Sequence, residues 1–221
     1  MAFALALWCP LAQAGASSAS PAGGDTGART AESRLPWMYE LEAGYLHPSL
    51  EQYSTFYGSG RSGFFSLSAA YRFRSWLEAG AEIGRMRDHG AGRVVGGSGL
   101  GGSVTYTLTP LQVFASFMLE RPGSRWVPYL SLGAAAIFYD ENIDLQPDRS
   151  GRSRFGGAEK AGVRWRFASK GGAEATLPAD TPWRGYVFLE AQHISGESAG
   201  FDLGGTAYML GVRIEFRLAG R

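Results

Sequence analysis

His193 and Ser195 have the residue types and the spacing of a hydrolytic pair. They are two positions apart, so in an extended strand both side chains lie on the same face. A histidine beside a serine can act as the general base that turns the hydroxyl oxygen into a nucleophile. The sequence favours the simpler alternative, in which both are ordinary polar residues at a strand end.

Charged residues form a second, larger set, because they recur at every second position between apolar residues. Glu40 and Glu42, for example, alternate with Tyr39, Leu41 and Ala43. In a strand, this spacing places the charges on one face and the apolar side chains on the other. The members of the set are Glu40, Glu42, Arg72, Glu78, Glu82, Lys160, Arg164, Arg166, Glu190, Arg213, Glu215 and Arg217.

The remaining motifs indicate little chemistry. Residues 96–102 (GGSGLGG) have the composition of a phosphate-binding loop but lack its lysine and its following helix. The three histidines, His47, His89 and His193, lie far apart, so neither a metal site nor a cofactor is expected. Four acidic residues between 140 and 148 predict a solvated loop, with divalent-cation binding as the alternative.

The elements that position these residues are predicted to be strands, because apolar and polar residues alternate strictly from Trp37 onward. The alternating segments are 37–45, 65–73, 77–84, 104–119, 128–139, 160–167, 186–192 and 208–218. Strands of about 9 to 11 residues are long enough to cross a thin membrane at a steep tilt.

The connections also alternate in length. Residues 74–75 and 120–125 predict short turns, whereas 48–61, 87–102, 140–153 and 195–205 predict longer loops rich in Gly, Ser and Asp. Residues 168–184 are an exception, a long connection where a short one is expected. In the fourth strand the apolar phase is even up to Leu108 and odd from Leu111, which predicts a β-bulge at Pro110.

Two faces of opposite polarity predict a membrane barrel, with the apolar face against lipid and the charged face in the lumen. Trp37, Trp76, Trp126 and other aromatic residues near the strand ends fit interfacial girdles. A soluble β-sandwich or lipocalin-like barrel is the alternative. Its interior should be apolar, whereas nearly every segment here carries charges.

We therefore predict an all-β chain that forms an eight-stranded antiparallel up-and-down transmembrane β-barrel with a polar, salt-bridged interior. Eight strands enclose only enough space for side chains, so no wide pore is expected. Since unpaired charges are costly there, we expect pairs between neighbouring strands. The predicted groups are Glu40 and Glu42 with Arg213 and Arg217, Glu78 and Glu82 with Arg72, and Lys160, Arg164 and Arg166 with Glu190.

Residues 1–14 (MAFALALWCPLAQA) predict a signal peptide cleaved after Ala14, which implies export to the bacterial outer membrane. Cleavage would remove Cys9, the only cysteine, so no disulfide is expected. Residues 15–35 are predicted to be a flexible leader, 36–218 the barrel and 219–221 a short tail. With 21 Lys and Arg against 20 Asp and Glu, and no dense basic run, no nucleic-acid partner is expected.

Residues 126–136 (WVPYLSLGAAA) and 208–216 (YMLGVRIEF) resemble strands of the OmpA/OmpW-like superfamily of small outer-membrane barrels. The resemblance covers most of Leu35 to Leu218. It implies contact with outer-membrane lipid and lipopolysaccharide and assembly by the barrel-assembly machinery. It also allows a protein partner to bind at the outer loops. Members usually end on an aromatic residue, whereas five residues follow Phe216 here.

His193 and Ser195 also resemble the H-x-S pair of lipid A 3-O-deacylases, which are eight-stranded barrels. The match is partial, because Gly196 and Ala207 stand where that family has Asn and Glu. The favoured function is a structural or loop-presenting barrel without a wide pore. A narrow channel for small or hydrophobic solutes is the first alternative, and a lipid A deacylase-like hydrolase using His193 and Ser195 is the second, so enzymatic activity stays undecided.

Overall fold

The computed structural model describes residues 35–50, 53–57, 60–93, 100–144, 148–170, 183–198 and 200–216. The predicted signal peptide and all but the last residue of the predicted leader lie outside these residues. So do residues 96–99 of the glycine-rich segment, Arg217 and Leu218 at the end of the predicted barrel, and the predicted tail.

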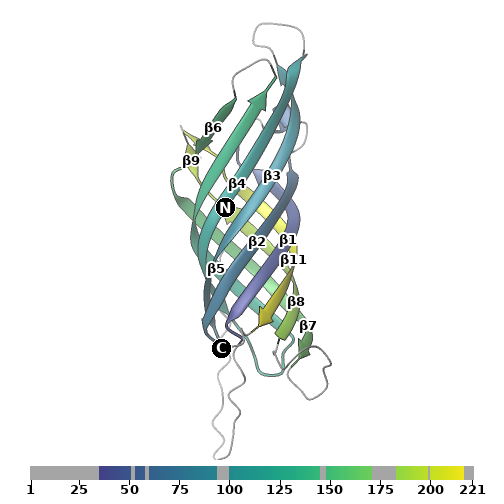
Figure 1. Cartoon of the computed structure of the whole chain (residues 1–221), viewed down its shortest axis with the longest axis vertical. Helices are drawn as coiled ribbons and strands as arrows, with labels where there is room; N and C mark the ends of the chain where they lie inside the picture. The colour runs from purple at the N-terminus through teal and green to yellow at the C-terminus, as the bar shows by residue number, and fades with distance from the viewer. Residues whose placement is uncertain are drawn as a thin grey trace, which may run out of the picture. The chain divides into compact units, whose positions relative to one another are not determined.

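Eight long strands form one closed antiparallel sheet (Figure 1). They are β1 (Trp37–Pro48), β2 (Ser62–Arg74), β3 (Leu77–Arg93), β4 (Leu100–Met118), β5 (Trp126–Ile143), β7 (Gly156–Lys170), β8 (Trp183–Ile194) and β11 (Gly205–Phe216). Each pairs with its neighbour along the chain, and β11 pairs back onto β1, with Trp37 opposite Phe216. The predicted eight-stranded up-and-down barrel is confirmed, and its closure leaves no free sheet edge among these strands.

Four short elements lie at the end of the barrel opposite Trp37 and Phe216. The strand β6 (Arg149–Arg152) pairs with β5, and β9 (Glu197–Ser198) pairs with β10 (Phe201–Asp202). The helix α1 (Tyr53–Tyr57) follows β1. Among the described residues, no helix has the length and apolarity to cross a membrane. We call the end of the barrel that carries these four short elements the loop end. The opposite end, with Trp37, Phe216 and the short turns, is the turn end.

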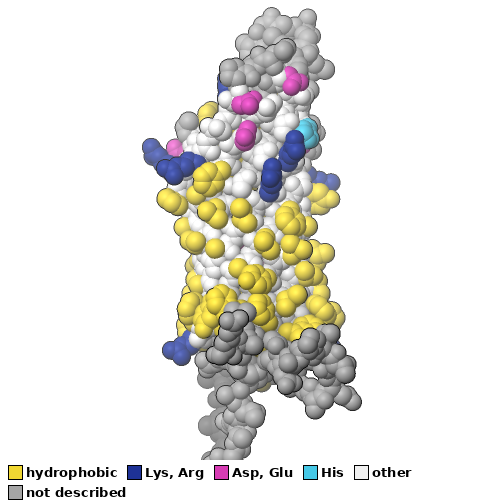
Figure 2. Space-filling model, in the orientation of Figure 1, with side chains coloured by type: hydrophobic (Ala, Val, Ile, Leu, Met, Phe, Trp, Pro, Cys, Tyr) yellow, Lys and Arg dark blue, Asp and Glu magenta, His cyan; other side chains and the backbone are white. Residues whose placement is uncertain are grey.

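The predicted alternation is present in the strands and divides the barrel wall into two faces. On β4, for example, Val113 is 59% exposed and the adjacent Gln112 is 1% exposed. The outward apolar residues form a belt around the turn-end part of the barrel, seen as yellow side chains in Figure 2. From Trp126 to Phe138 this belt covers about 41 Å of strand, or about 30 Å of height at a tilt of about 45°, which matches a membrane's hydrocarbon core.

Aromatic side chains gather at the turn end of the belt. Trp37 contacts Tyr71 edge to face, with ring centroids 5.1 Å apart, and Trp126 lies 6.3 Å from Trp165. Amphipathic rings at this level suit the interface between hydrocarbon and water. The expected aromatic girdle is therefore present at this end.

The predicted bulge at Pro110 is wrong. Pro110 pairs with Ile137 in an unbroken β4–β5 register, and Leu108 and Leu111 pair with Tyr139 and Ala136 on either side. Even-numbered residues of β4 face inward from Val104 to Met118. The apolar phase changes because the interior itself changes from polar to apolar at this height, so that Leu108 is buried inside while Leu111 is exposed outside.

The interior near the loop end is an apolar core. Its buried members come from most strands and from α1, and Leu50, Tyr57 and Tyr139 pack against them. We call this set the apolar outer lumen: Leu46, Tyr53, Phe64, Met86, Tyr106, Leu108, Ala135, Ile137, Ala158, Ile194, Leu203, Ala207 and Met209.

The strands are longer than predicted, and several predicted loops are strand. They run from 12 to 19 residues, and β3, β4 and β5 extend into the segments 87–102 and 140–153. The connection predicted at 168–184 is partly strand too, since β7 ends at Lys170 and β8 begins at Trp183. In these segments outward and inward positions both carry polar residues, such as the exposed Arg87 and the half-buried Asp88 on β3, so the strands continue without an apolar–polar alternation.

The register across Pro110 can be tested with nitroxide labels on single cysteines in a Cys9→Ser background, in lipid bilayers. Labels at Thr109→Cys and Leu111→Cys should both collide with dissolved oxygen outside the barrel, Leu111 within the apolar belt and Thr109 at its edge, because both positions face outward. A label at Leu108→Cys should be protected. If the label at position 109 were protected from oxygen and the label at 108 accessible, the result would support a bulge at Pro110.

Candidate functional site

The charged residues of the lumen form two clusters between the turn end and the apolar outer lumen. The arginine cluster contains Glu40, Arg72, Glu78, Arg164, Arg213 and Glu215. The lysine cluster contains Glu42, Glu82, Lys160 and Glu190. All ten side chains are buried, which makes their pairing decisive for the stability of the barrel.

Arg213 is the centre of the arginine cluster and is fully buried. Its guanidinium donates to Glu40 at 2.8 Å, to both carboxylate oxygens of Glu78 at 2.9 and 2.6 Å, and to Glu215 at 2.9 Å. The planar guanidinium fork suits several carboxylates at once, and such charge-assisted bonds are the strong ones.

Two further arginines complete this cluster. Arg164 donates to Glu40 and to Glu78, each at 3.0 Å, and Arg72 donates to Glu215 at 2.6 Å. Three arginines thus face three buried glutamates. The less buried Glu120 lies 3.6 Å from Arg72 and 3.5 Å from Arg184, so the charges still balance. The guanidinium of Arg164 also stacks over the ring of Tyr129, 3.9 Å from its centroid.

The lysine cluster is not balanced. Lys160 Nζ contacts Glu82, lies 3.1 Å from Glu190 and lies 3.8 Å from Glu42, so one ammonium faces three carboxylates. Tyr129 donates to Glu190 at 2.6 Å. Amides support Glu82: its Oε1 accepts from Gln112 at 3.2 Å and from Gln192 at 3.1 Å.

Glu42 is the least satisfied group of the lumen. It is 1% exposed, and neither carboxylate oxygen has a hydrogen-bond partner. Its nearest cation, Lys160, is shared with two other glutamates. No group of His, Cys, Asp and Glu among the described residues has the arrangement of a metal site.

The clusters and their supporting side chains draw on every strand of the barrel. Glu40, Arg72, Glu78, Gln112 and Tyr129 come from β1, β2, β3, β4 and β5 in turn. The strands β7, β8 and β11 supply Lys160 and Arg164, Glu190 and Gln192, and Arg213 and Glu215, respectively. The clusters therefore cross-link the wall across the lumen in addition to its main-chain ladders.

Several predicted pairs lie together. Glu40 is directly opposite Arg213 in the β1–β11 pairing, and Arg72 is opposite Glu78 in the β2–β3 pairing. Lys160 contacts Glu190, as expected from neighbouring strands.

Other predicted pairings differ in the structure. Glu82 contacts Lys160 across the lumen instead of Arg72, and Arg164 reaches Glu40 and Glu78 instead of Glu190. Arg166 donates to the main-chain oxygen of Ser124 at the turn end, at 3.0 Å. The physical reason is the width of the lumen, because a long side chain reaches strands on the far wall as easily as its neighbour.

Sequence reasoning missed the uncharged members, Gln112, Gln192 and Tyr129. All three occupy inward positions of alternating strands, which was the available signal. Residue type alone could not predict their bonding partners. The carboxylate that each side chain contacts depends on how the barrel closes.

His193 and Ser195 lie on the outer wall near the loop end and are bonded to separate strands. His193 Nδ1 lies 3.1 Å from the hydroxyl of Thr206, and the Ser195 hydroxyl accepts from the main-chain N–H of Gly157 at 2.9 Å. The carboxylate residue Glu159 is opposite His193 in the β7–β8 pairing. This neighbour was not predicted from the sequence. His193 and Ser195 thus have the contacts of ordinary polar residues at a strand end.

The helix α1 is tied to the barrel wall by Tyr53. Its hydroxyl donates to Asp88 of β3 at 2.7 Å, and its ring is 4% exposed over the apolar outer lumen. Burial, followed by the bond to Asp88, raises the pKa of Tyr53 well above its ordinary value, so the hydroxyl stays a donor at neutral pH. This contact holds α1 over the apolar outer lumen.

No family model and no curated protein sequence matches this chain. Solved structures do match its fold. Neisserial surface protein A is 16% identical, with a TM-score of 0.52, and the match covers 83% of this chain and 98% of that one. OprG from Pseudomonas aeruginosa is 16% identical, with a TM-score of 0.49, over 83% and 97% of the two chains. At this identity the likeness shows the fold alone, that of a small eight-stranded barrel of the outer-membrane type.

The two clusters should respond oppositely to the loss of one carboxylate. Glu78→Gln leaves Arg213 and Arg164 with a surplus of buried positive charge, so the free energy of unfolding should fall by about 3 kcal/mol or more. Glu42→Gln replaces a buried carboxyl group that has no hydrogen bond with a neutral side chain of the same shape, so stability should stay equal or rise.

Urea unfolding of the refolded barrel in detergent measures both variants, and the gel shift on boiling confirms folding. Equal destabilisation by the two substitutions would contradict the assignment of Glu42 as an unsatisfied carboxyl group.

Proposed function

We propose that this protein is a closed outer-membrane barrel that presents its loop end to a partner, without serving as an open pore. The observation that carries the proposal is the filling of the lumen. Arg213, Tyr186, Phe188 and Gln112 are among the largest fully buried side chains, and all point inward. A barrel of eight strands offers space for such side chains and little else.

The lumen would block solutes by two different means. In the half near the turn end, an ion must break bonds between buried charges, which costs several kcal/mol for each charge left unpaired. In the apolar outer lumen, an ion loses its hydration without finding new polar partners. No single solute is suited to both layers.

The loop end offers an ordered surface beyond the membrane. The strands β3, β4 and β5 have 17, 19 and 18 residues, against 12 each for β1, β8 and β11, so one side of the wall extends farther. Ser103 and Asp144 fasten this extension. Asp144 accepts from the Ser103 amide at 2.9 Å and from its hydroxyl at 2.7 Å, and these bonds lower the pKa of Asp144.

A narrow path for hydrophobic solutes remains the second candidate, favoured by one observation. The apolar outer lumen is the kind of environment that such a solute prefers, and α1 covers it. A solute would still have to displace Tyr53 and then meet the two charged clusters. This arrangement favours the closed barrel.

Planar bilayers containing the purified barrel should show no steady single-channel current, because large buried side chains fill the lumen. Liposomes containing it should not swell in isotonic solutions of small sugars. A stable conductance, or swelling above that of protein-free liposomes, would refute the closed barrel and support the narrow path.

Presentation of the loop end should be visible by labelling intact cells in a Cys9→Ser background. Asn142→Cys, exposed on the extended part of β5, should react with a membrane-impermeant maleimide. Arg121→Cys, exposed in the short turn between β4 and β5, should react only after the outer membrane is permeabilised. The reverse labelling pattern would show that the loop end faces the periplasm, and it would refute presentation of the loop end at the cell surface.

A further inference from the structure

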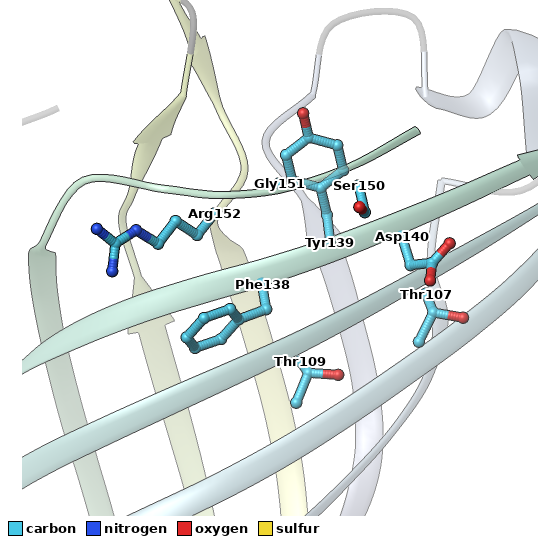
Figure 3. A pocket seen from close by; sticks show the side chains of 8 residues that line it. All are labelled: Thr107, Thr109, Phe138, Tyr139, Asp140, Ser150, Gly151 and Arg152. Carbon is cyan, nitrogen blue, oxygen red and sulfur yellow. The ribbon is translucent and has the colours of Figure 1, made fainter. Parts of the chain in front are cut away.

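A pocket of about 420 Å³ lies on the outer wall at the level where the apolar belt ends. Its lining comes from the extended parts of β4 and β5 and from β6, as Figure 3 shows. The lining residues are Thr107, Thr109, Phe138, Tyr139, Asp140, Ser150, Gly151 and Arg152.

The strand registers place these residues in two rows along the wall. In the first row Thr109 pairs with Phe138, and Phe138 pairs with Arg152. In the second row Arg87 of β3 pairs with Thr107, followed by Asp140 and Ser150. The pocket thus has hydroxyl groups along its floor.

Arginines flank the pocket on both sides. Arg152 rises from β6, while Arg85 and Arg87 face outward on β3, and all three are exposed. From β3 to β6 there are three strand spacings, or about 14 Å. Figure 2 shows Lys and Arg side chains immediately beyond the apolar belt on the face in view. This stretch of wall thus carries three exposed arginines and one exposed acidic residue of the pocket lining, Asp140, so its charge favours an anion.

The height of the pocket identifies the kind of anion. The outward apolar residues end at Ile83 on β3, Leu111 on β4 and Phe138 on β5, and polar residues follow on each strand. A molecule at this height therefore has its apolar part beside the belt and its polar part in the pocket. Because short turns mark the periplasmic side of such barrels, the loop end faces outward, where the outer leaflet lies.

We infer that this pocket binds the phosphorylated sugar headgroup of an outer-leaflet glycolipid, the chemistry that lipopolysaccharide carries. The guanidinium groups of Arg85, Arg87 and Arg152 pair with phosphate oxygens. The Thr107 and Thr109 hydroxyls exchange hydrogen bonds with sugar hydroxyls, and the Asp140 carboxylate accepts hydrogen bonds from them. Phe138 packs against the first part of an acyl chain. The inference needs the barrel's place in the membrane but not the proposed partner of the loops.

Binding of purified lipid A to the refolded barrel in detergent micelles tests the inference, with dephosphorylated lipid A and inorganic phosphate as parallel probes. The wild-type barrel should bind lipid A at least tenfold more tightly than the dephosphorylated form. Inorganic phosphate at millimolar concentration should not displace it, because phosphate lacks the sugar and the acyl chains.

The double variant Arg85→Gln/Arg152→Gln should lose at least tenfold in lipid A affinity. The matched control, Arg74→Gln/Arg121→Gln, removes two exposed arginines at the turn end and should change affinity less than twofold. The gel shift on boiling verifies folding. If the double variant does not fold, Arg152→Gln alone, on the short strand β6, should lose at least threefold.

Equal affinity for lipid A and its dephosphorylated form would overturn the inference, as would an equal loss in the control. Displacement by inorganic phosphate would show that the arginines hold a phosphate alone, and it would overturn the glycolipid assignment. None of these results bears on conductance or on surface labelling, so the closed-barrel proposal is tested separately.

Discussion

The bonds of Arg213 to Glu40, Glu78 and Glu215 are the interaction on which the interior of this barrel depends. In lipid the strands must close on themselves, because an open edge would leave main-chain groups without partners. Closure of eight strands encloses a lumen that is just wide enough for side chains to fill. The inward charges must therefore satisfy one another, and the arginine cluster does so with three cations and three anions.

The same narrow lumen explains why the two charged clusters differ. In the arginine cluster each guanidinium contacts two or more carboxylates, so the charges balance. Most polar atoms there are bonded, although Arg72 Nε and Arg164 Nε and Nη1 have no hydrogen-bond partner. The lysine cluster gathers three carboxylates around a single ammonium, and Glu42 is left without a hydrogen bond. Polar groups that are only partly satisfied cost stability in a low-dielectric interior. The lysine cluster thus stabilises the barrel less than a fully paired cluster would.

Inner and outer walls change character together along the long strands. On β4 the residues Gln112 and Leu108 mark the change inside from polar to apolar, while Leu111 and Thr109 mark the change outside from apolar to polar. The outside change follows the edge of the hydrocarbon layer. The inside change places an apolar core beneath α1, at a height where the outer wall already meets headgroups and water. A single strand therefore packs against lipid in one half and against its own core in the other.

The two-residue period by itself determined the number of barrel strands, their two faces and the inward position of the charges, because alternation records burial on one side of a strand. Direct neighbours such as Glu40 and Arg213 followed from the chain order and closure. The sequence could not place Arg164 beside Glu78, nor Glu82 beside Lys160, because those contacts cross the lumen and depend on its diameter and strand stagger. It also could not separate a bulge at Pro110 from a change of interior polarity. Only the tertiary structure shows which medium each face of a strand meets at a given height.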